Sequence, residues 1–74
     1  MEVNVRLFAT LREGRFREQK VEVKDNIRVL DIINQYDIPL EDVAICLVNG
    51  RDAEREQALK NGDTVSIFPP VGGG

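Results

Sequence analysis

The stretch that decides the fold is Val29-Leu30-Asp31-Ile32-Ile33-Asn34-Gln35-Tyr36. Its apolar side chains recur at i, i+3, i+4 and i+7, the spacing of a helix that buries one face, and Leu30 widens the stripe formed by Val29, Ile32, Ile33 and Tyr36. Asp31 falls in the first turn, where a carboxylate suits the positive end of the helix dipole. Pro39 predicts that the helix ends by about Tyr36 to Asp37, because the residue before a proline avoids helical angles.

Strand-like segments flank this helix on both sides. Before it, residues 3–8 alternate apolar and polar side chains, and residues 21–23 resume the alternation after a charged loop at 11–18, which predicts a hairpin. After it, the apolar run 44–48 is short enough for a buried strand and ends at the turn signal Asn49-Gly50. The last strand is predicted at residues 64–68, where apolar side chains alternate again.

The segment between the last two strands, residues 51–60, is mostly charged, and we expect a short helical turn there with Leu59 as its anchor. The predicted order is therefore β, β, α, β, a charged connection and β. A helix across one face of a small mixed sheet buries both apolar faces. The fold class expected is α+β, a β-grasp (ubiquitin-like) domain at residues 1–68 with four to five strands and one main helix on one face, followed by a flexible extended tail at 69–74.

Composition narrows the range of functions. The chain has 74 residues and a net charge of −3, with 10 Lys and Arg against 13 Asp and Glu, which argues against binding to nucleic acid. No apolar stretch approaches the ~20 residues of a membrane span, and no signal-peptide pattern precedes the first strand, so we expect a cytoplasmic protein. There is no histidine and one cysteine, Cys46, within an apolar run, so we expect a buried thiol, no metal site and no side-chain active site.

The unusual feature is the tail, Pro69-Pro70-Val71-Gly72-Gly73-Gly74. Six residues at ~3.3 Å each reach about 20 Å, and glycines without a Cβ can pass through a channel too narrow for side chains. The group delivered would be the terminal carboxylate of Gly74, which is ionised at neutral pH and must be activated, as by adenylation with ATP. No Walker loop is present, so a separate enzyme would have to bind the ATP. The alternative is a frayed chain end without a role.

These segments resemble the MoaD/ThiS sulfur-carrier family over essentially the whole chain. The resemblance is carried by Leu7-Phe8-Ala9-Thr10-Leu11-Arg12-Glu13, Val48-Asn49-Gly50 and residues 59–74, which read LKNGDTVSIFPPVGGG. The Phe-Ala-x-x-Arg-Glu opening and the Phe-Pro-Pro-Val-x-Gly-Gly ending look most like MoaD, the small subunit of molybdopterin synthase. The family's β-grasp fold agrees with the predicted element order.

The resemblance implies a sulfur-transfer cycle with three partners. A MoeB-like, ubiquitin-activating-enzyme-like adenylyltransferase would adenylate Gly74, and a sulfur donor protein would convert it to a thiocarboxylate. A MoaE-like large subunit would then receive the tail, with Gly73 and Gly72 as the access segment, and a pyranopterin precursor would take up the sulfur in molybdenum cofactor biosynthesis. The chain itself would bind no cofactor. Two alternatives share this chemistry: a ThiS-like thiamine carrier and a ubiquitin-like modifier joined to lysines.

A docking surface is predicted beside the tail. Strand alternation puts Phe8 and Phe68 on the face opposite the helix, and neighbouring first and last strands would bring the two rings together. With Pro69, Pro70 and Val71 they are the expected partner contacts; the alternative is that the rings only fold over the sheet edge. Two charged groups are interpreted as solvated surface, one formed by Arg12, Arg15 and Arg17 and the other by Asp52, Glu54 and Glu56.

Overall fold

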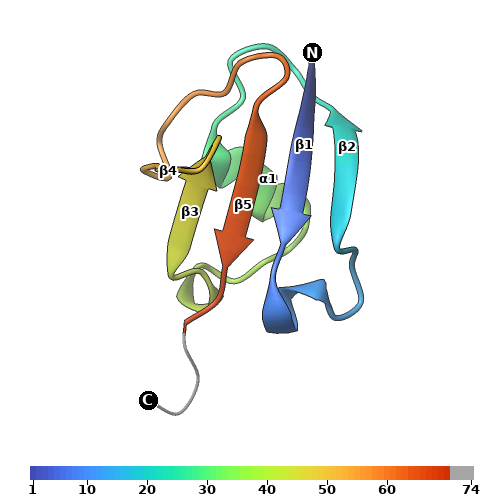
Figure 1. Cartoon of the computed structure of the whole chain (residues 1–74), viewed down its shortest axis with the longest axis vertical. Coiled ribbons are helices and arrows are strands. Elements are labelled where there is room, and N and C mark those ends of the chain that lie inside the picture. The colour runs from blue at the N-terminus through green and yellow to red at the C-terminus, as the bar shows by residue number, and fades with distance from the viewer. Residues whose placement is uncertain (71–74) are drawn as a thin grey trace.

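The chain folds into two layers, a mixed sheet and a helix packed on one of its faces (Figure 1). The computed structural model describes residues 1–70. Five strands lie in the order β2-β1-β5-β3-β4. In chain order the elements are β1 (Glu2–Leu7), the 3-10 helix η1 (Ala9–Arg12), β2 (Glu18–Glu22), α1 (Val29–Gln35), the 3-10 helix η2 (Leu40–Asp42), β3 (Ile45–Val48), β4 (Arg51–Asp52) and β5 (Thr64–Phe68). The β-grasp prediction is confirmed.

The centre of the sheet is the pairing of the first and last strands. β1 and β5 run parallel, with Val5 beside Val65 and Leu7 beside Ile67. All the other strand pairs are antiparallel. The crossing through α1 allows the parallel pair, because parallel neighbours need a long connection that covers a sheet face. The first and last strands of the described chain therefore lie side by side, with the N-terminus and the end of β5 at opposite ends of the sheet (Figure 1).

The core lies between α1 and the inner sheet face. The residues with no more than 1% exposure come from β1, β5 and α1: Val3, Val5, Leu7, Val29, Ile32, Ile33, Val65 and Ile67. Asp31 closes the start of α1, since its carboxylate accepts the Arg28 backbone N–H at 2.9 Å. Tyr36 caps the end of the helix, as the sequence predicts. No helix within residues 1–70 is long and apolar enough to cross a membrane.

The prediction of a helical turn in residues 51–60 is wrong. Arg51–Asp52 instead form β4, which pairs with Leu47 and Val48 of β3. The backbone groups on this edge of β3 need partners, and a short charged strand supplies them while staying exposed. Leu59 is nevertheless the anchor of the segment: it is buried, and its N–H donates to the Ile27 carbonyl at 2.8 Å.

Two further expectations need correction. The charged loop predicted at 11–18 contains the end of η1 and the start of β2, which begins at Glu18 because the β1 ladder continues to the Arg6–Glu18 pair. The run at 44–48 is not buried on both faces: Cys46 and Val48 point into the core, whereas Ile45 is 49% exposed. Since α1 covers only one sheet face, every second residue of β3 lies on the uncovered face (Figure 1).

Two isoleucines on neighbouring strands test this account of the layers. We expect Ile67→Val to lower the free energy of unfolding by about 0.5–1.5 kcal/mol, because it removes a buried methylene from the core. Ile45→Val is the matched control, and its effect should stay within about 0.5 kcal/mol because Ile45 is half exposed. Urea denaturation measures both. Equal losses would contradict the assignment of the two faces.

Candidate functional site

The tail begins at the end of the most protected strand of the sheet. β5 lies between β1 and β3, and its inner residues Val65 and Ile67 have no exposed surface. After Phe68 come Pro69, which is half-buried, and Pro70, which is exposed. The base of the tail is therefore fixed by a strand that is paired on both sides. The remaining predicted tail residues, Val71, Gly72, Gly73 and Gly74, lie outside the described residues.

The two phenylalanines predicted beside the tail do lie together. The rings of Phe8 and Phe68 are stacked, with centroids 4.1 Å apart and planes inclined by 12°. The Phe8 N–H donates to the Ile67 carbonyl at 3.2 Å, so the β1–β5 ladder continues one residue past β1 and fixes the position of this ring. Both rings are half-buried on the uncovered face. The prediction that they share that face is correct.

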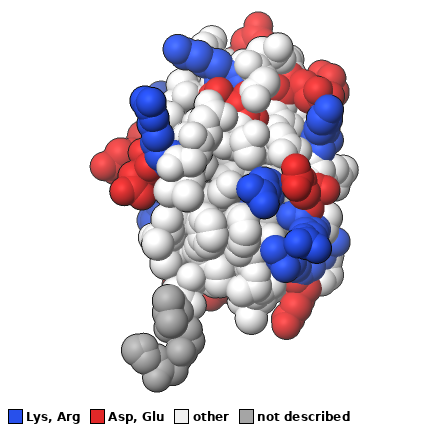
Figure 2. Space-filling view, viewed as in Figure 1, with Lys and Arg blue, Asp and Glu red and all other residues white. Residues whose placement is uncertain are grey.

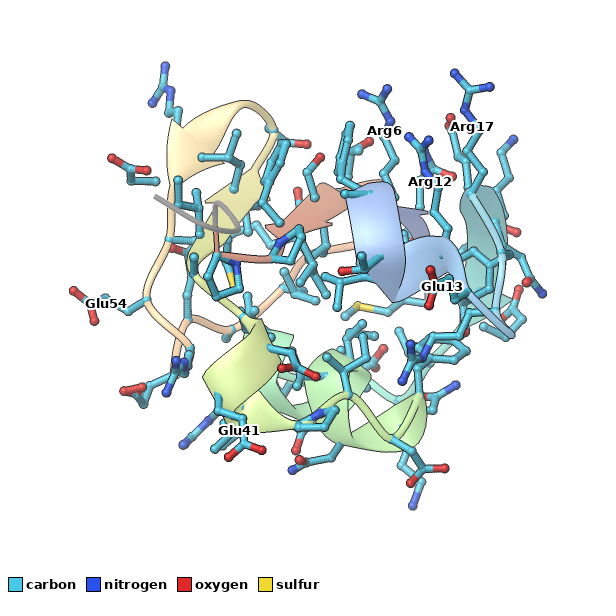
Figure 3. All side chains as sticks on the ribbon, turned by 90° about the horizontal axis from the view of Figure 1, so that it is seen from below. Arg6, Arg12, Glu13, Arg17, Glu41 and Glu54 are labelled. Carbon is cyan, nitrogen blue, oxygen red and sulfur yellow. The ribbon has the colours of Figure 1, made fainter. Side chains whose placement is uncertain are left out.

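Two arginines hold the Phe8 ring. The guanidinium carbons of Arg6 and Arg12 lie 5.3 Å and 5.4 Å from its centroid, within the range of cation–π attraction. Arg12 Nε also donates to the Leu7 carbonyl at 2.8 Å, which fixes the guanidinium, and Arg6 Nε lies 3.6 Å from a carboxylate oxygen of Glu18. Figure 3 shows Arg6, Arg12 and Arg17 pointing to the same side, away from α1. Positive charge therefore borders the aromatic pair.

The exposed apolar surface is larger than the sequence predicted. Ile45 pairs with Phe68 across β3 and β5, and the half-buried Leu47 lies two residues along the same face. We call Phe8, Ile45, Leu47 and Phe68 the open-face patch. In Figure 2 this side of the molecule has an uncharged centre bordered by both basic and acidic side chains. Alternation from Cys46, whose burial was predicted, was the signal that could have placed Ile45 and Leu47 here.

The interpretation of Arg12 and Arg15 as solvated is wrong: Arg12 is half-buried against Phe8 and Leu7, and Arg15 is held by the backbone. The Arg15 guanidinium donates to three backbone carbonyls, those of Leu11 at 3.2 Å, Tyr36 at 3.0 Å and Asp37 at 3.2 Å. The Phe16 ring packs edge-on against Tyr36, with centroids 4.9 Å apart. Arg15 therefore ties the segment that carries Arg12 to the end of α1. The acidic residues Asp52, Glu54 and Glu56 are exposed, as interpreted, and Glu54 points away from the patch (Figure 3).

Cys46 is not equipped to carry sulfur. Its side chain is buried in the core, as predicted. Burial raises the pKa of the thiol and nearby Arg55 only partly opposes this, so the nucleophilic thiolate is disfavoured. Within residues 1–70 no three His, Cys, Asp or Glu side chains come together as a metal site would require. What the described residues build is a partly exposed apolar patch beside the end of β5.

A family model described as the ThiS family matches residues 5–74 of the chain. The match covers the patch strands and the tail alike. The chain belongs to the ThiS family. This family membership confirms the MoaD/ThiS resemblance found in the sequence. The chain therefore has the ubiquitin-like fold of the sulfur-carrier family.

Several solved structures are similar to this ThiS-family chain. A Pyrococcus furiosus protein assigned as molybdopterin converting factor subunit 1 is 32% identical over 96% of this chain and 99% of its own, with a TM-score of 0.77. Subunit 1 in a complex of molybdopterin-converting factor subunits 1 and 2 from Helicobacter pylori is 27% identical over 100% of both chains, with a TM-score of 0.67. SAMP1 from Haloferax volcanii is 27% identical over 100% of both chains, with a TM-score of 0.77.

The raised pKa of Cys46 predicts a loss of stability at alkaline pH. In the unfolded chain the thiol ionises near its ordinary value of 9.0, whereas the folded thiol still holds its proton there. The folded state then binds more protons, so the free energy of unfolding falls as pH rises above that value. Cys46→Ala should flatten this dependence in urea titrations between about pH 8 and 10. A slope unchanged by the substitution would contradict the assignment and point to Tyr36, whose pKa burial also raises and which remains in the variant.

Proposed function

We propose that this chain is a sulfur carrier that acts as the small subunit of a molybdopterin synthase. Its terminal glycine, Gly74, would be adenylated, converted to a thiocarboxylate and then used to donate sulfur to a pyranopterin precursor. The observation that carries the proposal is the position of the open-face patch, which adjoins the end of the strand that leads into Phe-Pro-Pro-Val-Gly-Gly-Gly. A patch at the base of a reactive tail can hold a partner while the tail enters its active site.

The chemistry at Gly74 explains why such partners are needed. A terminal carboxylate has a pKa of ~3.3–3.7, so it is ionised at neutral pH and resists attack by a nucleophile. Adenylation converts it to a mixed anhydride, and sulfide can then displace AMP to give the thiocarboxylate directly. A persulfide on a donor protein would displace AMP to give an acyl disulfide, and a second thiol of the donor would then attack the donor's own sulfur, forming a disulfide and releasing the thiocarboxylate. ATP would be bound by a MoeB-like adenylyltransferase, and a sulfur donor protein would supply the sulfur. The chain has no histidine, so acid–base catalysis would come from the large subunit.

The open-face patch indicates the kind of partner surface that fits. Stacked aromatic rings at the centre of an exposed patch are typical interface anchors. Arg6 and Arg12 beside Phe8 favour a partner that places carboxylates next to its apolar pocket. The Helicobacter pylori structure, in which molybdopterin-converting factor subunits 1 and 2 form a complex, supports a MoaE-like large subunit as that partner.

A protein-modifier function is the second candidate, because SAMP proteins are among the similar structures. The same acyl adenylate can be attacked by sulfur or by a lysine amine, and a ThiS-like thiamine carrier would use the sulfur route as well. Intact mass spectrometry of protein from cells separates these outcomes. Exchange of one oxygen for sulfur supports a carrier, whereas linkage of the chain to target lysines supports a modifier. Co-purification with a large synthase subunit separates the molybdopterin carrier from the thiamine carrier.

One residue added after Gly74 tests the role of the terminus. We expect normal folding by circular dichroism and complete loss of thiocarboxylate formation, because the carboxylate is displaced from the activating site. Sulfur transfer by the extended chain, with the extra residue still present by mass, would contradict the proposal.

Phe68→Ala tests the patch. Loss of the stacked ring should weaken binding to the large subunit by at least about tenfold, as expected of an interface anchor, and lower the free energy of unfolding by about 0.5–1.5 kcal/mol. Phe16→Ala is the matched control, because Phe16 also packs on one aromatic ring but lies away from the patch. Calorimetric titration should show near-normal binding for Phe16→Ala. Equal loss of binding in both variants would refute docking through the patch.

A further inference from the structure

The outer edge of β2 is the exposed edge of the sheet on the side away from β4 (Figure 1). Met1 and Val23 exchange backbone hydrogen bonds at 2.9 Å and 2.8 Å, and the Leu7 N–H donates to the Arg17 carbonyl. The odd-numbered residues of this segment therefore bond to β1. Because hydrogen-bonding direction alternates along an antiparallel strand, the N–H and C=O groups of Glu18, Lys20 and Glu22 point outward. A row of peptide groups is thus available to a further strand.

The side chains along this edge alternate in charge. The segment reads Glu18-Gln19-Lys20-Val21-Glu22-Val23-Lys24, with acidic and basic residues in turn at the even positions. Register with β1 places Glu18, Lys20 and Glu22 on the uncovered sheet face, opposite Arg6, Asn4 and Glu2. Glu18, Lys20 and Glu22 are all exposed. This order of charges is the property that selects a partner strand.

We propose that a second copy of this chain pairs with β2 through the same edge, antiparallel, about a two-fold axis at Val21. In this register Lys20 lies opposite Glu22 of the partner subunit, and Glu18 opposite Lys24 of the partner subunit. The Lys20–Glu22 pairs join residues whose peptide groups point outward, so backbone and side-chain pairing agree there. The interface is isologous, which is the usual symmetry of a homodimer.

Charge excludes the neighbouring registers. A shift by two residues in one direction places Lys20 against its own copy, and the opposite shift does so for Glu22. Like charges directly opposite each other are destabilising. Edge lysines usually prevent strand addition, but in the register about Val21 both Lys20 and Lys24 of each copy lie opposite carboxylates. Among residues 1–70, Lys20, Glu22 and Lys24 form no ion pair within the chain, whereas Glu18 contacts Arg6 and Asn4. The central Lys20–Glu22 pairs therefore set the register.

The dimer is compatible with the proposed function and does not depend on it. The open-face patch lies on β5 and β3 and at the end of β1, whereas the dimer uses the outer edge of β2. Since the two copies run antiparallel, the carboxyl ends of their β5 strands face opposite ends of the joined sheet. Each copy can therefore present its own patch to a separate partner.

Charge-reversing substitutions at Lys20 and Glu22 test this interface. We expect sedimentation equilibrium to show a concentration-dependent dimer of the wild-type chain. Lys20→Glu and Glu22→Lys should each raise the dimer dissociation constant at least about tenfold, because each turns two attractive pairs into repulsive ones. An equimolar mixture of the two variants should recover the dimer. In the mixed pair one copy carries glutamate at both positions and the other carries lysine at both, so both central contacts are attractive again. Lys60→Glu, at an exposed lysine on another loop, is the control and should dimerise normally.

Amide exchange gives a second readout on the wild-type chain. Diluting the protein should speed hydrogen exchange at the outward amides of Lys20 and Glu22, while the amide of Val21, bonded to β1, should change little. A wild-type chain that stays monomeric at millimolar concentration would overturn the inference. A dimer that survives Lys20→Glu, or variants that fail to recover a dimer when mixed although both remain folded by circular dichroism, would overturn it equally. Sulfur transfer measured on monomeric variants tests the proposed function separately.

Discussion

The parallel pairing of β1 with β5 is the constraint on which the other features depend. It joins the first and last strands of the described chain at the centre of the sheet, and the buried pairs Val5–Val65 and Leu7–Ile67 stabilise it. Because the ladder continues to the Phe8 N–H, the ring of Phe8, which follows β1, meets the ring of Phe68, the last residue of β5. The place where the tail begins and the surface beside it are thus set by the same hydrogen bonds.

A single helix divides the roles of the two sheet faces. α1 covers one face and forms the core, so the other face keeps apolar side chains that no described segment covers. Four of these side chains form the open-face patch, and arginines border it. In the proposed function this surface would serve recognition and the terminal glycine would carry the reacting group, while another protein would supply the catalytic groups. The small size of the chain is consistent with this division of work.

Much of the fold follows from sequence pattern alone. The helix at Val29 to Tyr36 and the strands around it have the periods that burial requires, and Phe8 and Phe68 could be placed together by alternation. Predictions from sequence pattern were wrong where neighbouring segments determine the local structure or the exposure of a residue. The charged residues Arg51 and Asp52 form a strand because β3 needs an edge partner, and Ile45 is exposed because nothing in residues 1–70 covers its face. The charged composition of the loop predicted that Arg15 is solvated. Its guanidinium instead donates to three backbone carbonyls, which only the folded chain brings together.

The contacts of Arg15 have a consequence for the binding surface on the opposite side of the loop. The Arg15 guanidinium donates to the Leu11 carbonyl of η1 and so helps to hold Arg12 and the Phe8 ring in place before a partner binds. Association would then not lose the conformational entropy of a mobile loop. Lysine, with the same charge but no planar fork, could not reach three acceptors at once. If the open-face patch binds a partner as proposed, its rigidity would depend on Arg15, a side chain that the partner need not contact.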